Sequence, residues 1–376
     1  MPSALSAPFQ AVLIALIALS ASPALADDNR KSEPPRRSGE ARTPALEPEL
    51  GGEASAKPAA TEPDKPHRDG EAAPKSTADS ATARRLERFE ITGEPFRWTM
   101  TRDRVMRTYT RWQGTFPSAV KSGLKENDTV RISYYRPRGK GAPTAAKPGH
   151  AVLILHHLGG GHEAEEVFAA YLATNGIAAA TMRFPFYGKR RPEGFKKQIL
   201  RADPRTLGTF IRQAVADVRR ASDVLRSLPE TRKDRIGLAG VSLGAVIGSL
   251  ACGIDARFHR VSLILGGGRL DQILTSDAPE VTGIREWLES RKVDRKTLRS
   301  WLDGCEPCHY AHRVETRRIL MLNAWNDEII PRRSTLALHK AFGEPKIHWY
   351  QTGHYGAALH IFNILRRSKT HLAEDS

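Results

Sequence analysis

The chain has 376 residues, of which 40% are hydrophobic and 27% charged, with 30 Gly, 24 Pro and three Cys. This composition excludes a collagen, a small disulfide-stapled protein and a polytopic membrane protein, and it leaves room for one large domain or two ordinary ones. The formal net charge is +16. Residues 27–83 hold 9 Lys or Arg against 12 Asp or Glu, so the basic excess belongs to residues 84–376.

This basic excess favours acidic substrates, anionic polymers of the cell envelope or anionic membrane surfaces as neighbours. The sequence has no zinc-finger spacing and no RNA-binding aromatic motif. We therefore expect no nucleic-acid partner.

The first 26 residues have the features of an export signal. The apolar run at 11–19 is too short to span a bilayer comfortably, and Ala24-Leu25-Ala26 forms a small-x-small cleavage site. We expect cleavage after residue 26 and a periplasmic or secreted protein, with an uncleaved membrane anchor as the alternative.

A predicted linker follows at residues 27–84. Up to residue 83 it contains no Phe, Trp or Tyr, and its only large aliphatic residues are Leu46 and Leu50. Such a segment cannot bury enough apolar area to offset its ordering entropy, so we expect a disordered tether. A tail that binds the cell wall or a partner is the alternative.

Residues 85–376 alternate short apolar runs with longer amphipathic stretches. Strands are predicted at 129–136, 151–155, 177–182, 236–239, 261–265, 319–322 and 346–350, and helices at 163–174, 207–228, 243–252, 284–302, 333–342 and 357–367. This alternation indicates an α/β fold with a mostly parallel central sheet and helices on both faces. The long excursion at 270–312 predicts a helical cap over the site.

Ser242 stands in Gly240-Val-Ser-Leu-Gly244, between a predicted strand and a predicted helix. This is the setting of a nucleophile elbow, because small residues beside the serine permit a sharp turn that lifts its hydroxyl above the sheet. We expect Ser242 to be a nucleophile. The alternative is a serine that merely packs in a glycine-rich turn.

A serine hydroxyl needs a base, and the base needs a group that fixes its tautomer. Asp327 follows the predicted strand 319–322, and His354 follows the last predicted strand. The chain order Ser, Asp, His is the one expected for this architecture. We expect His354 to be the base and Asp327 the acid, with Glu328 as the substitute acid. The alternatives are an Asp327 that forms a turn or caps a helix, and a surface histidine.

Two backbone N–H groups are expected to stabilise the oxyanion of the tetrahedral intermediate. One belongs to Leu243, directly after the serine. The other comes from the loop His-His-Leu-Gly-Gly-Gly at 156–161, where Leu158 is the first choice and His157 the second. A flexible glycine-rich turn is the alternative for this loop.

The loop after the predicted strand 177–182 is basic and aromatic. It leaves the sheet at the same edge, so Arg183, Tyr187 and Arg190 are candidates for binding a carboxylate or phosphate of the substrate. A solvated charged turn fits the pattern equally well.

The motif Cys305-Glu-Pro-Cys308-His309 fits the pattern for covalent haem attachment, but no cytochrome-like helices surround it. A short-loop disulfide or two thiols are the remaining alternatives. We expect Cys252 to be a buried small residue, and no paired-histidine spacing predicts a metal site.

Four short motifs carry the candidate residues: His-His-Leu-Gly-Gly-Gly at 156–161, Gly-Val-Ser-Leu-Gly at 240–244, Asn-Asp-Glu-Ile-Ile-Pro at 326–331 and Gly-His-Tyr at 353–355. With them, residues 95–370 resemble the α/β-hydrolase superfamily, nearest to dienelactone-hydrolase-like and related bacterial serine esterases. The resemblance implies Ser242 as nucleophile, Asp327 as acid and His354 as base.

The sequence therefore predicts an exported serine hydrolase that cleaves a carboxylic ester of a small molecule or saccharide through an acyl-enzyme, without a cofactor. Cleavage of a peptide or thioester uses the same residues. A non-catalytic binding protein on a hydrolase scaffold, tethered to the envelope, is the alternative from another class. Nothing in the sequence specifies an oligomeric state.

Overall fold

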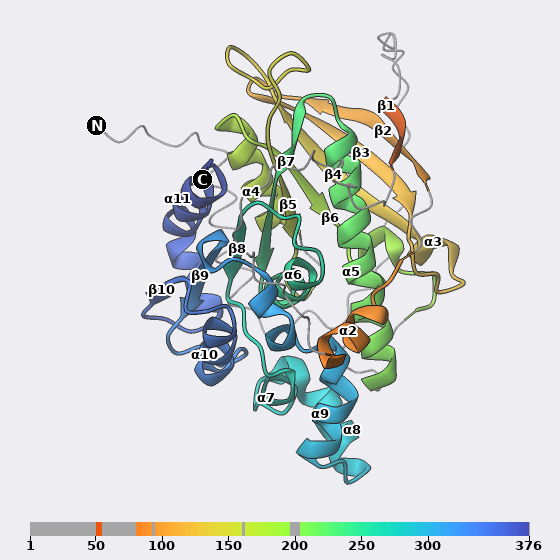
Figure 1. Ribbon diagram of the computed structural model, residues 1–376, viewed down its shortest axis with the longest axis vertical. Coiled ribbons are helices and arrows are strands. Elements are labelled where there is room, and N and C mark those ends of the chain that lie inside the picture. The colour runs from red at the N-terminus through yellow and green to blue at the C-terminus, as the bar shows by residue number, and fades with distance from the viewer. Residues whose placement is uncertain (1–49, 55–79, 92–94, 160–161, 196–203, 376) are drawn as a thin grey trace, which may run out of the picture.

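The computed structural model describes residues 50–54, 80–91, 95–159, 162–195 and 204–375 (Figure 1). The predicted export signal and most of the predicted linker lie outside these residues. None of the described helices is long and apolar enough to cross a membrane.

A single sheet of ten strands runs through the described residues in the order β1-β2-β3-β4-β6-β5-β7-β8-β9-β10 (Figure 1). The first four strands pair antiparallel with one another, and β4 pairs antiparallel with β6. The remaining pairs from β6 to β10 are parallel. The strands are β1 (Leu50–Ala54), β2 (Phe96–Val105), β3 (Tyr109–Pro117), β4 (Thr129–Pro137), β5 (Gly149–Leu155), β6 (Ala178–Met182), β7 (Thr231–Val241), β8 (Val261–Ile264), β9 (Ile319–Ala324) and β10 (Lys346–Tyr350).

Helices cover both faces of this sheet (Figure 1). They are α2 (Ser80–Glu87), α3 (Lys125–Asp128), α4 (Glu163–Thr174), α5 (Pro204–Ser227), α6 (Leu243–Ile254), α7 (Leu270–Leu274), α8 (Thr282–Ser290), α9 (Arg295–Leu302), α10 (Arg332–Ala341) and α11 (Ile361–Leu372). Short 3-10 helices, among them η3 (Pro279–Val281) and η8 (Tyr355–His360), join them.

The central strand β5 shows why the sheet needs helices on both sides. Leu153 and Leu155 belong to the core beneath α5 and α6, whereas Val152 and Ile154 belong to the core beneath α4 and α11. All four side chains are fully buried. Because successive strand residues face opposite sides of a sheet, an unbroken apolar run requires cover on both faces. The prediction of a mostly parallel α/β fold is confirmed.

The hairpin β2–β3 was not predicted from the pattern of apolar residues. In β2 the buried residues Phe96, Trp98 and Met100 alternate with exposed ones, and the strand then continues with exposed residues to Val105. The charged residues at 102–104 break the apolar alternation, so hydrophobicity does not predict the second half of this strand. The hairpin extends the sheet on the side away from the parallel strands.

Two described parts of the predicted linker are regular elements. The strand β1 pairs antiparallel with β2. The helix α2 begins at Ser80, and its Arg85 guanidinium forms an ion pair of 2.9 Å with Asp303. Arg85, the first residue after the predicted linker, therefore joins α2 to the excursion at 270–312.

The predicted helix at 284–302 is in fact two helices, α8 and α9. Lys292 has a φ of 52°, a left-handed conformation that ends the first helix. Asp294 then caps α9, because its carboxylate accepts a hydrogen bond of 2.7 Å from the Thr297 N–H. The prediction of one helix is wrong because an apolar period continues across a local break in the backbone.

Candidate active site

Ser242 lies at the sharp turn between β7 and α6, with φ 52° and ψ −113°. This conformation is costly for a residue with a side chain. The turn requires glycine two residues before and two residues after Ser242. A Cβ on Gly240 would lie 2.2 Å from the Gly244 carbonyl oxygen, and a Cβ on Gly244 would lie 2.3 Å from the carbonyl oxygen of Leu155.

The close approach of α6 to β5 predicts different outcomes for two glycines of the same helix. Gly244→Ala should lower the free energy of unfolding by at least about 2 kcal/mol, because the new Cβ overlaps backbone that cannot move away. A Cβ on Gly248 meets side chains at an ordinary 3.6 Å, so Gly248→Ala should be neutral or stabilising. Urea unfolding of both variants measures the difference, and equal midpoints would contradict the turn described here.

Ser242, Asp327 and His354 meet above the carboxyl edge of the parallel strands. The Ser242 Oγ lies 3.0 Å from His354 Nε2. The other ring nitrogen, Nδ1, lies 2.8 Å from Asp327 Oδ2 and 2.9 Å from Oδ1. All three residues are more than nine-tenths buried. The three predicted side chains are therefore brought together in one hydrogen-bonded chain.

The neighbouring carboxylates Asp327 and Glu328 have different partners. Asp327 Oδ1 accepts the backbone N–H groups of Ile329 and Ile330 at 3.0 and 2.7 Å, which orients the carboxylate toward the imidazole. Glu328 accepts the backbone N–H of His354 at 2.9 Å. Asp327 thus holds the ring, and the substitute acid Glu328 holds the loop that carries it.

The expected oxyanion donors lie next to Ser242. Leu243 is the first residue of α6, so its N–H has no carbonyl one turn earlier to bind. The N–H of His157 donates to Glu165 Oε1 at 3.2 Å and is engaged. No hydrogen bond to another described residue involves the Leu158 N–H. These contacts favour Leu158 over His157 as the second donor.

The loop after β5 is fixed by a buried histidine that sequence reasoning missed. The Phe184 N–H donates to His156 Nε2 at 3.0 Å, so the proton of the ring is on Nδ1, which donates to the His157 carbonyl at 2.7 Å. Burial lowers the pKa of His156 to about 3, so the ring stays neutral. Its two hydrogen bonds hold the backbone just before Leu158.

A second pair in this loop joins His157 to Glu165 of α4. His157 Nδ1 lies 2.8 Å from Glu165 Oε1, and the Glu165 side chain is fully buried. Burial alone would lower the pKa of His157, but the hydrogen bond and charge of Glu165 outweigh it and raise the pKa. In the sequence, Glu165 is one of several acids that are ordinary at a helix N-terminus, so no local signal marked it.

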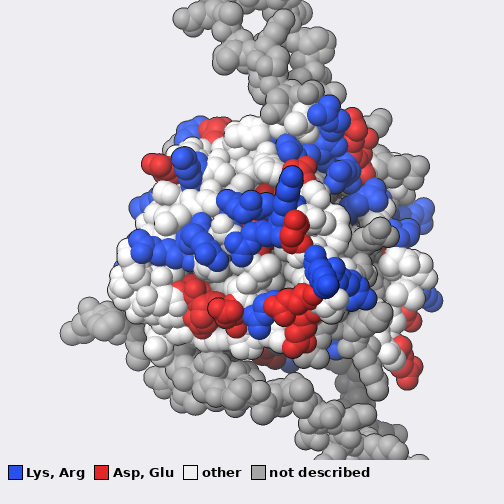
Figure 2. Space-filling model, turned by 90° about the horizontal axis from the view of Figure 1, so that it is seen from below, with Lys and Arg blue, Asp and Glu red and all other residues white. Residues whose placement is uncertain are grey.

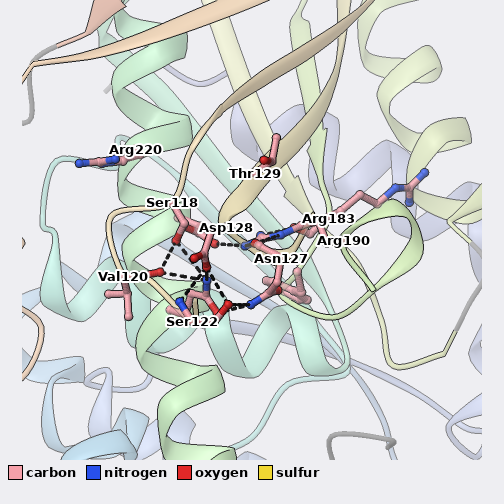
Figure 3. Close-up of polar contacts among 12 residues, drawn as sticks. Ser118, Val120, Ser122, Asn127, Asp128, Thr129, Arg183, Arg190 and Arg220 are labelled. Atoms are coloured by element: carbon pink, nitrogen blue, oxygen red, sulfur yellow. Dashed lines mark hydrogen bonds and ion pairs between the residues drawn. The ribbon is translucent and has the colours of Figure 1, made fainter. Parts of the chain in front are cut away.

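The structure places Arg183, Tyr187 and Arg190, the predicted substrate-binding residues, against partners within the protein. Arg190 is fully buried, and its Nη2 forms an ion pair of 2.8 Å with Asp217 of α5. Its Nε and Nη1 donate to the carbonyls of Asn127 and Arg183, both at 2.9 Å (Figure 3). Arg190 therefore stabilises the fold. A guanidinium that is paired with a buried carboxylate is not available to bind a substrate.

The other two residues of this loop also face protein partners. Arg183 Nη2 donates to Glu166 at 3.0 Å. Tyr187 is 5% exposed, and its ring centroid lies 5.0 Å from that of His156. Neither they nor Arg190 lines either of the described cavities that contact Ser242.

Arg190→Ala should lower the free energy of unfolding by about 3–5 kcal/mol, because it leaves Asp217 buried without its counter-charge. Arg191→Ala is the matched control. Arg191 is exposed, and its change should stay within about 0.5 kcal/mol. Denaturant unfolding measures both. If Arg190→Ala were as stable as the wild type and lost only its activity on anionic substrates, Arg190 would be a substrate-binding residue after all.

Cys252, Cys305 and Cys308 are free thiols. Cys252 is buried, and burial raises its pKa to about 12. Among the described residues, no group of three or more His, Cys, Asp or Glu side chains is arranged to hold a metal ion. The structure thus has the two thiols of the Cys-x-x-Cys motif in place of a disulfide.

Two apolar cavities meet at Ser242. The larger has a volume of about 210 Å³ and extends past His354 between α4 and α11. The smaller has a volume of about 70 Å³ and lies between α6 and the excursion at 270–312. Four residues line both cavities: Leu158, Ser242, Glu280 and Ile329. An ester bond placed beside the Ser242 hydroxyl therefore has an apolar space on either side.

Together, the sheet, the elbow and the chain order of the three residues define the α/β-hydrolase fold. No protein-family model and no curated protein sequence matches the chain. Among solved structures, the acetyl xylan esterase from Paenibacillus sp. R4 is similar with a TM-score of 0.58 and 19% identity, over 77% of this chain and 92% of that one. Acetyl xylan esterase 1 from Thermoanaerobacterium sp. JW/SL YS485 is similar with a TM-score of 0.57 and 16% identity, over the same shares. At these identities the likeness shows the fold.

Proposed function

We propose that this protein is a serine hydrolase that cleaves a carboxylic ester. The observation that carries the proposal is the hydrogen-bonded chain from Ser242 through His354 to Asp327. A carboxylate beside Nδ1 keeps the proton on that nitrogen, so Nε2 is free to accept the proton of the serine hydroxyl. The fold shared with two acetyl xylan esterases supports ester hydrolysis as the reaction class.

In the proposed first half-reaction, Ser242 Oγ attacks the ester carbonyl while His354 Nε2 takes its proton. The N–H groups of Leu243 and Leu158 donate to the oxyanion that forms. The C–O bond to the alcohol then breaks, and His354 returns the proton to the leaving oxygen. The product is an acyl-enzyme on Ser242 and a free alcohol.

In the second half-reaction, His354 takes a proton from water, and the hydroxide oxygen attacks the acyl carbon. Collapse of the second tetrahedral intermediate returns the proton to Ser242 and releases the carboxylic acid. Ester and water thus become acid and alcohol, and the enzyme is unchanged. Asp327 keeps its charge throughout and stabilises the imidazolium.

The experiment that tests this proposal is hydrolysis of p-nitrophenyl butanoate, with the matched anilide as the control for peptidase chemistry. We expect release of nitrophenol well above the rate without enzyme, and a much slower release of nitroaniline. Faster cleavage of the anilide would favour a peptidase. Binding of the ester by folded protein without turnover would favour the non-catalytic binding protein.

We also propose that the protein acts in the periplasm or outside the cell, because residues 1–26 have the pattern of a cleaved export signal. The mature protein should begin at Asp27, which N-terminal sequencing of the exported protein tests.

On the face drawn in Figure 2, Lys and Arg side chains alternate with clusters of Asp and Glu. This face therefore offers no uniformly basic surface to an anionic polymer.

A further inference from the structure

The two cavities at Ser242 differ in one respect that bears on the reaction. The larger cavity is lined by His354 and by residues that follow it, among them Ala358, Ile361 and Leu365. The smaller cavity is lined by Leu243, Val246 and Leu274, and His354 does not contribute to it. The general acid thus lies on the side of the larger cavity.

The chemistry of ester cleavage assigns a half of the substrate to each cavity. The alcohol oxygen leaves with a proton from His354, so this oxygen must lie on the imidazole side of Ser242. The alcohol half then continues into the larger cavity. The acyl half lies on the other side of the scissile bond, which directs it into the smaller cavity beside α6.

Side chains on the wall of the larger cavity make it a poor site for a hydroxylated alcohol. Two of its polar side chains are already paired, Tyr355 with Glu280 and His157 with Glu165. Much of the rest of the wall is aliphatic or aromatic. A sugar bound there would lose hydrogen bonds to water without replacing them, whereas an apolar alcohol would gain by leaving water.

Exposed apolar side chains accompany the wall of the larger cavity. Tyr355 lines this cavity and is 48% exposed. Leu359 and Phe362, which directly follow the lining residues Ala358 and Ile361 in the chain, are 69% and 41% exposed. Neighbouring exposed apolar side chains at the mouth of a cavity indicate a ligand that continues beyond it.

Glu280 bears on substrate charge. It lines both cavities, and its Oε2 is buried without a hydrogen-bond partner among the described residues. A carboxylate at the junction repels an anionic group on either half of the substrate. With Arg190 committed to Asp217, no predicted arginine compensates for it.

We infer that the substrate is a neutral ester with a short apolar acyl group in the smaller cavity and a bulky apolar alcohol in the larger one. This inference rests on the proposed function and names its substrate class. It separates the protein from its similar structures, because an acetylated polysaccharide has a hydroxylated alcohol half.

A series of esters that varies one half at a time tests the inference. With butanoate as the fixed acid, kcat/KM should rise at least about tenfold from the methyl to the hexyl ester and fall below the methyl value for butanoyl glucose. With p-nitrophenol as the fixed alcohol, kcat/KM should fall from butanoate to dodecanoate. The kcat/KM for methyl hydrogen succinate should be lower than that for methyl butanoate. In the Glu280→Gln variant the difference between these two kcat/KM values should be smaller.

Two cavity-filling variants test the assignment of the halves. Ala358→Phe, in the larger cavity, should lower the hexyl-to-methyl ratio of kcat/KM at least about tenfold. Leu274→Phe, in the smaller cavity, should lower the butanoate-to-acetate ratio instead. Circular dichroism checks that each variant is folded, and the ester series on the unchanged protein tests the substrate class without them.

The outcomes separate the two proposals. Equal kcat/KM for methyl and hexyl butanoate, or a preference for butanoyl glucose, overturns the inference while ester hydrolysis stands. Exchanged effects of the two variants overturn the assignment of the halves. If folded protein cleaves no ester and a fluorophosphonate does not label Ser242, both proposals fail.

Discussion

Ser242→Ala is expected to lower kcat for ester hydrolysis by about a million-fold, to the level left by binding and the oxyanion donors. The substitution removes the nucleophilic oxygen that lies 3.0 Å from His354 Nε2. The fold should remain, because alanine adopts the backbone of the turn at the same cost as serine and fills less space. Initial rates with p-nitrophenyl butanoate measure the loss.

Ser249→Ala is the matched control for this loss. Ser249 lies two turns along α6, is buried, and donates its hydroxyl to the Ala245 carbonyl at 2.6 Å. Its removal should leave kcat within about twofold, because it touches neither the cavities nor the three site residues. Retention of more than about a hundredth of kcat by Ser242→Ala would mean that another group is the nucleophile.

Asp327→Asn is expected to lower kcat by about ten thousand-fold. An asparagine can keep the two backbone N–H groups of Ile329 and Ile330 if its oxygen takes the place of Oδ1. Its amide nitrogen then faces His354 Nδ1, which must lose its proton to accept. The proton moves to Nε2, and the ring can no longer take the proton of Ser242.

Glu328→Gln separates the ring from the loop that carries it. The Glu328 carboxylate accepts the His354 backbone N–H at 2.9 Å, and a glutamine oxygen can accept the same hydrogen bond. We expect a loss below about tenfold in kcat. A larger loss for Glu328→Gln than for Asp327→Asn would assign the acid to Glu328 and contradict the contacts of the ring.

The parallel half of the fold was predictable from the sequence because its strands are buried on both faces. Residues 151–155 form an unbroken apolar run, and such runs alternate with amphipathic helices from β5 to β10. The loops after β7, β9 and β10 must then open at one edge. That rule alone brings Ser242, Asp327 and His354 together, without any knowledge of distances.

The antiparallel half was less predictable because its strands are partly exposed. In β2, charged residues at 102–104 interrupt the apolar pattern, so a strand and a solvated turn look alike. The break between α8 and α9 depends on the left-handed backbone of Lys292, which no apolar period reports. Local sequence does not predict an element whose position depends on one backbone angle or on an exposed strand at the edge of the sheet.

The basic loop after β6 shows how far the sequence alone can predict the residues of the site. Its position at the carboxyl edge suggested a substrate anion, but Arg190 forms an ion pair with Asp217. Its Nε also donates to the Asn127 carbonyl (Figure 3). Asp217 stands 27 positions away on α5, and only the packing of that helix against the loop brings the charges together. The same holds for Glu165 and His157, which meet across α4 and the loop after β5.

Mass spectrometry of the wild-type protein after treatment with an alkyl fluorophosphonate tests most directly whether Ser242 is the nucleophile. We expect one phosphonyl adduct per chain, on the peptide that contains Ser242, and no adduct on the Ser242→Ala or denatured protein. A reagent that leaves the folded wild-type chain unmodified, or that modifies a different serine, would contradict the claim that His354 and Asp327 activate the Ser242 hydroxyl.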